Sequence, residues 1–114
     1  METIRTNEIW KVTHQLSRLL HTLSVKGRAE PMLYTVRYQS VLVITRIIDA
    51  QLCSDTKMRN EQYHRALVLL TQIEYLSLLL VETGALDKYN ADEVIEHIWQ
   101  ARHLIIAEQQ EPRP

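Results

Sequence analysis

The chain has 114 residues, of which 46% are hydrophobic and 24% are charged, with two glycines, three prolines and no phenylalanine. A single domain of this length buries roughly two thirds of its unfolded surface, so it can fold without a metal or a disulfide. The single Cys53 excludes an intramolecular disulfide, and no apolar run approaches the roughly 18 residues that a membrane span requires. We therefore expect a soluble, cytoplasmic protein with no membrane association.

The net charge of −1 hides an asymmetry along the chain. Residues 1–65 contain ten of the 13 Lys and Arg and six of the 14 Asp and Glu, whereas residues 66–114 contain three and eight. This distribution suits a basic surface for nucleic acid, an acidic surface for a basic partner, or head-to-tail contact between subunits. Solvated helix faces with no specific partner explain it equally well.

Helical spacing of apolar residues predicts a first helix that Thr6 or Asn7 caps and that ends at Gly27 in a left-handed conformation. The residues on its buried face are Ile9, Val12, Leu16, Leu19, Leu20 and Leu23. A second helix is predicted from Pro31 to Leu52, because proline fits a first helical turn, where its missing N–H is not needed.

The second helix carries a wide apolar arc and a few charged residues. The arc comprises Leu33, Tyr34, Val36, Val41, Leu42, Val43, Ile44, Ile47 and Ile48. Several of these residues are β-branched, but strand-like alternation is not sustained, so a helix is the better interpretation.

The most apolar segment of the chain belongs to a third helix, which starts near Met58 or Asn60 after a polar turn over Ser54–Lys57 and ends at Gly84. At 100° per residue its apolar side chains form two stripes. One stripe consists of Leu69, Leu70, Ile73, Leu76, Leu80 and Val81, and the other of Leu67, Val68, Tyr75, Leu78 and Leu79. One stripe suffices for a small helical core, so the second stripe predicts an interface with another chain. The pattern leaves open which stripe faces the core.

The fourth helix is predicted to follow a link over Leu86–Tyr89, with Asn90 as its cap and Glu93 completing a capping box. Its buried residues are Val94, Ile95, Ile98, Ala101, Leu104 and Ile105, and it ends near Glu108. Four amphipathic helices with short connections predict an all-α fold, an antiparallel up-down four-helix bundle that forms a single domain over residues 1–110. Residues 111–114 are expected to be a disordered tail.

Sites for chemistry are sparse in the sequence. A metal centre in such a bundle needs Glu-x-x-His twice with two further carboxylates, but Glu61 and His64 supply this spacing once and Glu93 and His97 are four residues apart. Arg59 precedes His64 by five residues, the spacing of the active site in some helical RNases, but the polar context of that signature is absent and we interpret the two residues as a surface pair at the start of the helix. We expect no cofactor, no metal and no enzymatic activity.

A nucleic-acid surface is a stronger hypothesis than a catalytic site. The candidate residues, around the second helix and the start of the third, are Arg37, Arg46, Lys57, Arg59 and Arg65. A local density of positive charge is what attraction to phosphates requires. Tyr34, Tyr38 and Tyr63 are interleaved with these cations and can stack on bases, although helical spacing suits core or interface positions as well.

Several features from Leu42 onward carry a family resemblance: the polar turn over residues 54–57, Arg65-Ala66 ahead of Leu70-Thr-Gln-Ile73-Glu-Tyr75-Leu76, and the link over residues 86–89 before an Ile-rich fourth helix. With these features the chain resembles the accessory variability determinant family of diversity-generating retroelements, which is related to proteins encoded in ribosomal-RNA intervening sequences. The resemblance implies a non-enzymatic four-helix bundle that assembles as a ring, often a pentamer, binds the reverse transcriptase of the element and contacts RNA or DNA. The alternative is a structural or interaction bundle that binds protein only.

Overall fold

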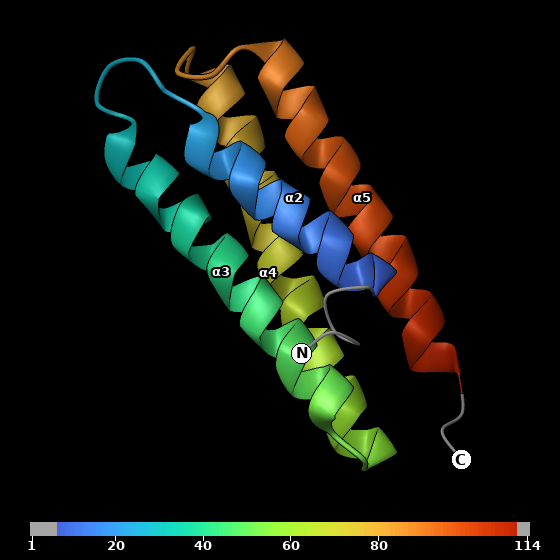
Figure 1. Cartoon of the computed structure of the whole chain (residues 1–114). Helices are drawn as coiled ribbons and strands as arrows, with labels where there is room; N and C mark the ends of the chain where they lie inside the picture. Colours follow the sequence, from blue (N-terminus) through green and yellow to red (C-terminus); the bar gives the residue numbers. More distant parts are fainter. Residues whose placement is uncertain (1–6, 112–114) are drawn as a thin grey trace.

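The computed structural model describes residues 7–111, which form four α-helices and contain no β-strand (Figure 1). The helices are α2 (Glu8–Thr22), α3 (Glu30–Leu52), α4 (Thr56–Glu82) and α5 (Lys88–Gln110). The predicted all-α four-helix fold is confirmed. Of the tail predicted to be disordered, residues 112–114 lie outside the described residues, whereas Glu111 lies inside them.

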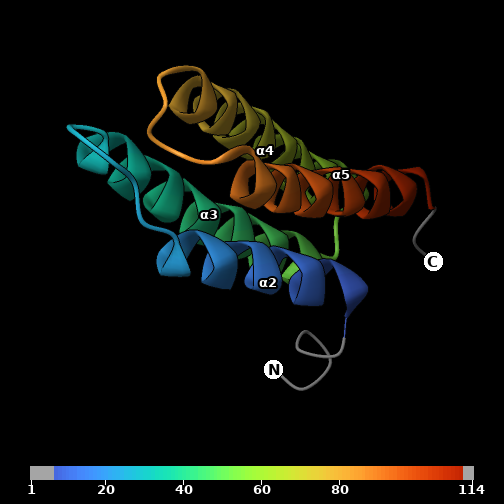
Figure 2. The same ribbon diagram turned by 90° about the horizontal axis from the view of Figure 1, so that it is seen from above.

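Each helix packs against two others around a shared interior. α3 contacts α2 and α4, and α5 contacts α4 and α2, so that α2 and α3 lie on one side of the molecule and α4 and α5 on the other (Figure 2). The α2–α3 and α4–α5 links meet at one end, where the N–H of Lys26 donates to the carbonyl of Ala85 at 3.0 Å. The molecule is elongated, with extents of 50 × 23 × 21 Å. Its long sides therefore supply most of its surface.

The core is aliphatic and receives residues from all four helices. Its fully buried members include Leu16 and Leu20 from α2, Val36, Val43 and Ile47 from α3, Leu70, Ile73 and Leu80 from α4, and Val94, Ile98 and Ile105 from α5. These residues recur every three or four positions, which places them on one face of each helix. Burial of this apolar surface is the main favourable term that holds the helices together.

The first helix begins where it was expected, but its end was predicted wrongly. Asn7 is the cap, with its side-chain oxygen 2.8 Å from the N–H of Ile9. The helix ends at Thr22, and Gly27, although its φ is +70°, lies in the following turn. The side chain of Arg37 donates to carbonyls at this end, so a glycine is not needed there to satisfy them.

The second helix matches its predicted bounds to within one residue, and Pro31 lies in its first turn. Its apolar arc was predicted too wide, because Tyr34 is 57% exposed and Val41 is 44% exposed. Ser40, which is fully buried in this helix, donates a hydrogen bond to Ser17 of α2 at 2.9 Å. The contact satisfies both hydroxyls in the interior.

The starts of the last two helices lie earlier than predicted, because an aspartate caps each of them. Asp55 accepts from the N–H of Met58 at 2.9 Å, which starts α4 at Thr56. Asp87 accepts from the N–H of Asn90 at 2.8 Å, so Asn90 is not the cap of α5 and no capping box forms with Glu93. An aspartate and an asparagine three residues apart are both suitable caps, and sequence alone does not rank them.

Candidate functional site

The second apolar stripe of the third helix lies on the outer surface of α4. Val68, Tyr75 and Leu78 are 43%, 64% and 46% exposed. Leu67 and Leu79 are half-buried, and Leu67 packs against the core. The other stripe faces the interior, so the structure decides which stripe belongs to the core.

α4 is more apolar than its contribution to the core requires. Its most apolar window of 18 residues has a mean hydropathy of 1.3, enough by length and composition to cross a membrane, a test that core helices of soluble proteins also pass. Only 28% of that window is buried. The rest of the fold therefore leaves much of the apolar surface of this helix uncovered.

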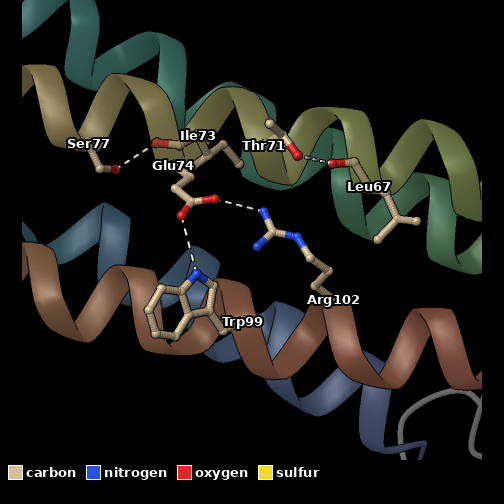
Figure 3. Close-up of polar contacts among 7 residues, drawn as sticks. All are labelled: Leu67, Thr71, Ile73, Glu74, Ser77, Trp99 and Arg102. Carbon is tan, nitrogen blue, oxygen red and sulfur yellow. Dashed lines mark hydrogen bonds and ion pairs between the residues drawn. The ribbon is translucent and has the colours of Figure 1, made fainter.

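A polar cluster lies between α4 and α5 beside this surface (Figure 3). Glu74 accepts a hydrogen bond from the guanidinium of Arg102 at 2.8 Å and another from the indole N–H of Trp99 at 3.2 Å. Burial by itself raises the pKa of Glu74, but the hydrogen bonds from Arg102 and Trp99 and the charge of Arg102 together lower the pKa below its usual value. The carboxylate is therefore charged at neutral pH and fixes Trp99, whose side chain is 53% exposed.

The neighbouring hydroxyl groups on α4 are satisfied within their own helix. Thr71 donates to the carbonyl of Leu67 at 3.0 Å, and Ser77 donates to the carbonyl of Ile73 at 2.8 Å (Figure 3). These two hydroxyls therefore have their partners within α4. The exposed apolar and aromatic residues of α4 nearest to Glu74 along the helix are Tyr75 and Leu78.

Three of the five predicted nucleic-acid residues make contacts within the fold, and two of these three, Arg37 and Arg46, lie in α3. Arg37 donates to the carbonyls of Leu20 and Leu23 at 3.0 and 2.8 Å, and so completes the end of α2. Arg46 forms an ion pair with Asp49 at 3.4 Å and contacts Gln62 of α4. Both side chains are partly exposed; the bonds of Arg37 involve its Nε and one terminal nitrogen, whereas those of Arg46 involve one terminal nitrogen.

Arg59 was predicted wrongly as a surface cation. Its side chain is 1% exposed, its guanidinium donates to the carbonyl of Glu111 at 2.9 Å, and it lies 3.9 Å from the carboxylate of Glu108. The arginine therefore joins the start of α4 to the end of α5, where a positive charge is favourable beside the free carbonyls. No sequence pattern signals this role, because only the packing of the helices brings the two helix ends together.

Lys57 and Arg65 are the two predicted cations whose side chains are exposed. They line a shallow cavity of about 480 Å³ at the start of α4, together with Asn60, Glu61 and His64. His64 was not among the residues predicted to contact nucleic acid, although it lies two helical turns after Lys57 and directly before Arg65. Two cations and an imidazole can attract phosphate, and Glu61 weakens that attraction.

A second polar cavity, of about 310 Å³, lies between α2 and α5. Its lining includes Arg18, Glu93 and His97, and the Nδ1 of His97 is held 2.8 Å from the carbonyl of Glu93. Over residues 7–111, no group of three His, Cys, Asp or Glu side chains comes together in a way that could hold a metal ion.

No protein-family model matches this chain, and no curated protein or solved structure matches it. The fold and the surface are therefore the basis for assigning a function. Together they define a four-helix protein whose main distinguishing feature is an uncovered apolar stripe along α4 and the adjoining part of α5.

Proposed function

We propose that this protein is a non-enzymatic accessory or adaptor protein that acts by assembly, as its resemblance to retroelement variability determinants implies. Copies of the chain form a cytoplasmic ring, and the number of subunits to be tested is five. The ring binds a reverse transcriptase with its RNA or DNA template. The observation that carries the proposal is the exposure of Val68, Tyr75 and Leu78 along α4. Covering apolar surface is favourable by roughly 25 cal/mol per Å², so such a stripe favours association.

The proposed architecture of the subunit is an antiparallel up-down bundle. Its support is the order of contacts between α3 and α4: Gln39 bonds to Gln72, whereas Arg46 bonds to Gln62. Residue numbers rise along one helix as they fall along the other. An up-down bundle presents four long parallel edges, which suits lateral packing of subunits.

The Glu74–Arg102 pair gives the proposed interface a fixed polar element within an apolar surface. Charged pairs at interfaces contribute to orientation and partner choice more reliably than to affinity. Arg102 and Glu74 are 28% and 23% exposed, so a partner that covers this surface must accommodate the pair. This requirement selects one arrangement of the two surfaces.

The proposed contact with nucleic acid is confined to Lys57, Arg65 and the adjacent His64. Two cations predict a weak dependence on salt, with log affinity for single-stranded RNA falling with log salt at a slope of roughly −1.4. Such a slope is shallow for a dedicated nucleic-acid-binding protein. In the proposed complex, the reverse transcriptase therefore supplies most of the affinity for the template.

A second candidate function is protein binding without any contact to nucleic acid. The internal roles of Arg37, Arg46 and Arg59 favour it, since three of the five predicted cations are engaged within the fold. Under this alternative the same stripe on α4 meets another protein, and the acidic residues of α5 meet a basic partner.

Assembly is tested by measuring molar mass with light scattering after size exclusion, over about 5–200 µM protein. The double variant Val68→Glu, Leu78→Glu places two charges on the stripe and should give a monomer with unchanged helicity by circular dichroism. Gln72→Glu is the matched control, because it adds a charge on α4 but keeps the oxygen that accepts from Gln39. A monomeric wild-type chain at 200 µM would contradict the proposal.

The accessory role is tested with a fluorescein-labelled 20-nucleotide RNA and a purified reverse transcriptase from a diversity-generating retroelement. We expect comigration of the protein with the enzyme, and RNA binding that weakens between about 50 and 200 mM salt and in the variant Lys57→Glu, Arg65→Glu. Comigration without any effect of this variant on RNA binding would support the protein-only function. Assembly without comigration or RNA binding would overturn the accessory role.

A further inference from the structure

A second uncovered stripe runs along α3. Tyr34 and Tyr38 are 57% and 64% exposed, and Val41 is 44% exposed. These residues lie at positions i, i+4 and i+7, which is one face of a helix. This stripe begins beside a cation, since the guanidinium carbon of Arg37 lies 5.8 Å from the ring centre of Tyr34.

The two stripes lie on opposite sides of the molecule. On α3, Arg37 reaches the carbonyls of α2, while Gln39, on the other flank, reaches Gln72 of α4. Tyr34, beside Arg37, therefore belongs to the side formed by α2 and α3. On α4, Glu74 reaches α5, so the exposed residues near it belong to the side formed by α4 and α5. In Figure 2 these two helices lie across the molecule from α2 and α3.

The two sides also differ in charge. Residues 8–52, which span α2 and α3, contain six Lys and Arg against three Asp and Glu, whereas residues 56–111, which span α4 and α5, contain five against nine. The acidic residues of the second side flank its apolar stripe: Glu82 follows Leu78 by one helical turn, and Glu96 precedes Trp99 by three positions. Each side is therefore electrostatically complementary to the other and repels a copy of itself.

We infer that the α3 stripe of one copy, around Tyr38, packs against the α4–α5 stripe of the next copy, around Leu78 and Trp99. This inference rests on the proposed self-assembly and specifies its geometry. The contact joins two different surfaces, so a pair of copies still has one uncovered stripe at each of its two ends. Further copies can add at these ends until a ring closes. A two-fold symmetric dimer covers one stripe and leaves the other exposed.

The sides of the molecule are large enough for this contact. A long side of 50 by 21 Å offers about 1,000 Å², compared with the roughly 800 Å² that each partner buries in a standard protein interface. Tyr38 and Trp99 are the aromatic groups of the kind that dominate binding energy at such contacts.

Two single variants distinguish this contact from a symmetric one. Tyr38→Glu blocks the α3 stripe and leaves the α4–α5 stripe intact, and Leu78→Glu does the reverse. Each variant alone should be monomeric. When the two are mixed, the intact α4–α5 stripe of the first meets the intact α3 stripe of the second, and a one-to-one heterodimer forms that cannot grow further.

Native mass spectrometry of the mixture, with one variant carrying ¹⁵N, identifies the heterodimer by its intermediate mass. Thr35→Glu on α3 and Gln72→Glu on α4 are the controls; both residues are exposed, and both variants should assemble like the wild type. Circular dichroism confirms that each variant is folded.

Two outcomes overturn the inferred contact while leaving self-assembly in place. In one, Tyr38→Glu still forms the wild-type oligomer. In the other, the two variants are each monomeric and remain so when mixed. A monomeric wild-type chain would instead overturn the proposed function itself, so the two failures are distinguishable.

Discussion

The guanidinium of Arg102 on α5 donates a hydrogen bond of 2.8 Å to the carboxylate of Glu74 on α4, beside the exposed apolar stripe of that helix. The pair holds the two helices in register and fixes Trp99 beside them through a second hydrogen bond of 3.2 Å. The pair therefore stabilises the subunit and also places a polar contact within the proposed interface.

Glu74→Gln should lower stability at pH 7 by about 0.5–1 kcal/mol, because the amide oxygen still accepts hydrogen bonds but the charge is lost. The folded-state pKa of Glu74 lies below its ordinary value of 4.5. Its stabilisation is therefore complete above about pH 4.5 and lost as the pH falls through the folded-state pKa. Urea unfolding at pH 7 and pH 3 measures the difference between wild type and variant, which should shrink at the lower pH. An equal difference at both pH values would show that the charge does not contribute.

Arg59→Ala should destabilise the protein by about 2–3 kcal/mol, because it opens a cavity and leaves the carbonyl of Glu111 without its donor. Arg59→Met keeps much of the side-chain volume and should cost about 1–2 kcal/mol. The exposed Arg65→Met is the control and should change stability by less than about 0.5 kcal/mol. Urea unfolding followed by circular dichroism checks all three. Equal effects at positions 59 and 65 would contradict the buried role of Arg59.

Asp87→Ala should cost about 1 kcal/mol, because Asp87 is the cap of α5 and accepts hydrogen bonds from both the N–H and the side-chain amide of Asn90. Asn90→Ala removes only the side-chain contact and should cost about 0.5 kcal/mol or less. Thermal unfolding of the two variants measures this order. A larger loss of stability for Asn90→Ala than for Asp87→Ala would instead identify Asn90 as the cap.

Leu70→Ala should destabilise the subunit by about 2–5 kcal/mol at every protein concentration, because Leu70 is fully buried in the core. Leu78→Ala removes a side chain that is 46% exposed and should leave the stability of the monomer within about 0.5 kcal/mol. The comparison is made at protein concentrations low enough for the wild type to be monomeric. At higher concentrations, the midpoint of Leu78→Ala should fall below that of the wild type, since association stabilises the folded state. A concentration-independent loss of several kcal/mol would place Leu78 in the core.

Several local features could be predicted because they depend on neighbours in the sequence. The cap at Asn7, the proline in the first turn of α3 and the glycine after α4 all follow from the conformational preferences of single residues. Gly84 adopts a φ of +77°, and the N–H groups of Gly84 and Ala85 satisfy the carbonyls at the end of α4. The errors at helix ends arose where an equivalent residue stood nearby, as Asp87 did for Asn90, or where a distant side chain supplied the missing donor, as Arg37 did for α2.

The sequence alone could not show which basic residues are buried, which have partners within the fold and which are exposed. Arg37, Arg59 and Arg65 carry the same charge and lie in similar local patterns, but one completes a helix end, one is buried and one is exposed. Burial and partners depend on which helices pack together, so the candidate site contracts from five cations to Lys57 and Arg65, with His64 added.

By itself, the sequence determined the number of helices, their approximate bounds and the presence of two apolar stripes on the third helix, because periodicity and turn chemistry are local properties. Only the tertiary structure decided which of those stripes is covered. That choice depends on where the faces of α3 and α5 meet α4, and it leaves Val68, Tyr75 and Leu78 outside the core while Leu70, Ile73 and Leu80 lie inside it.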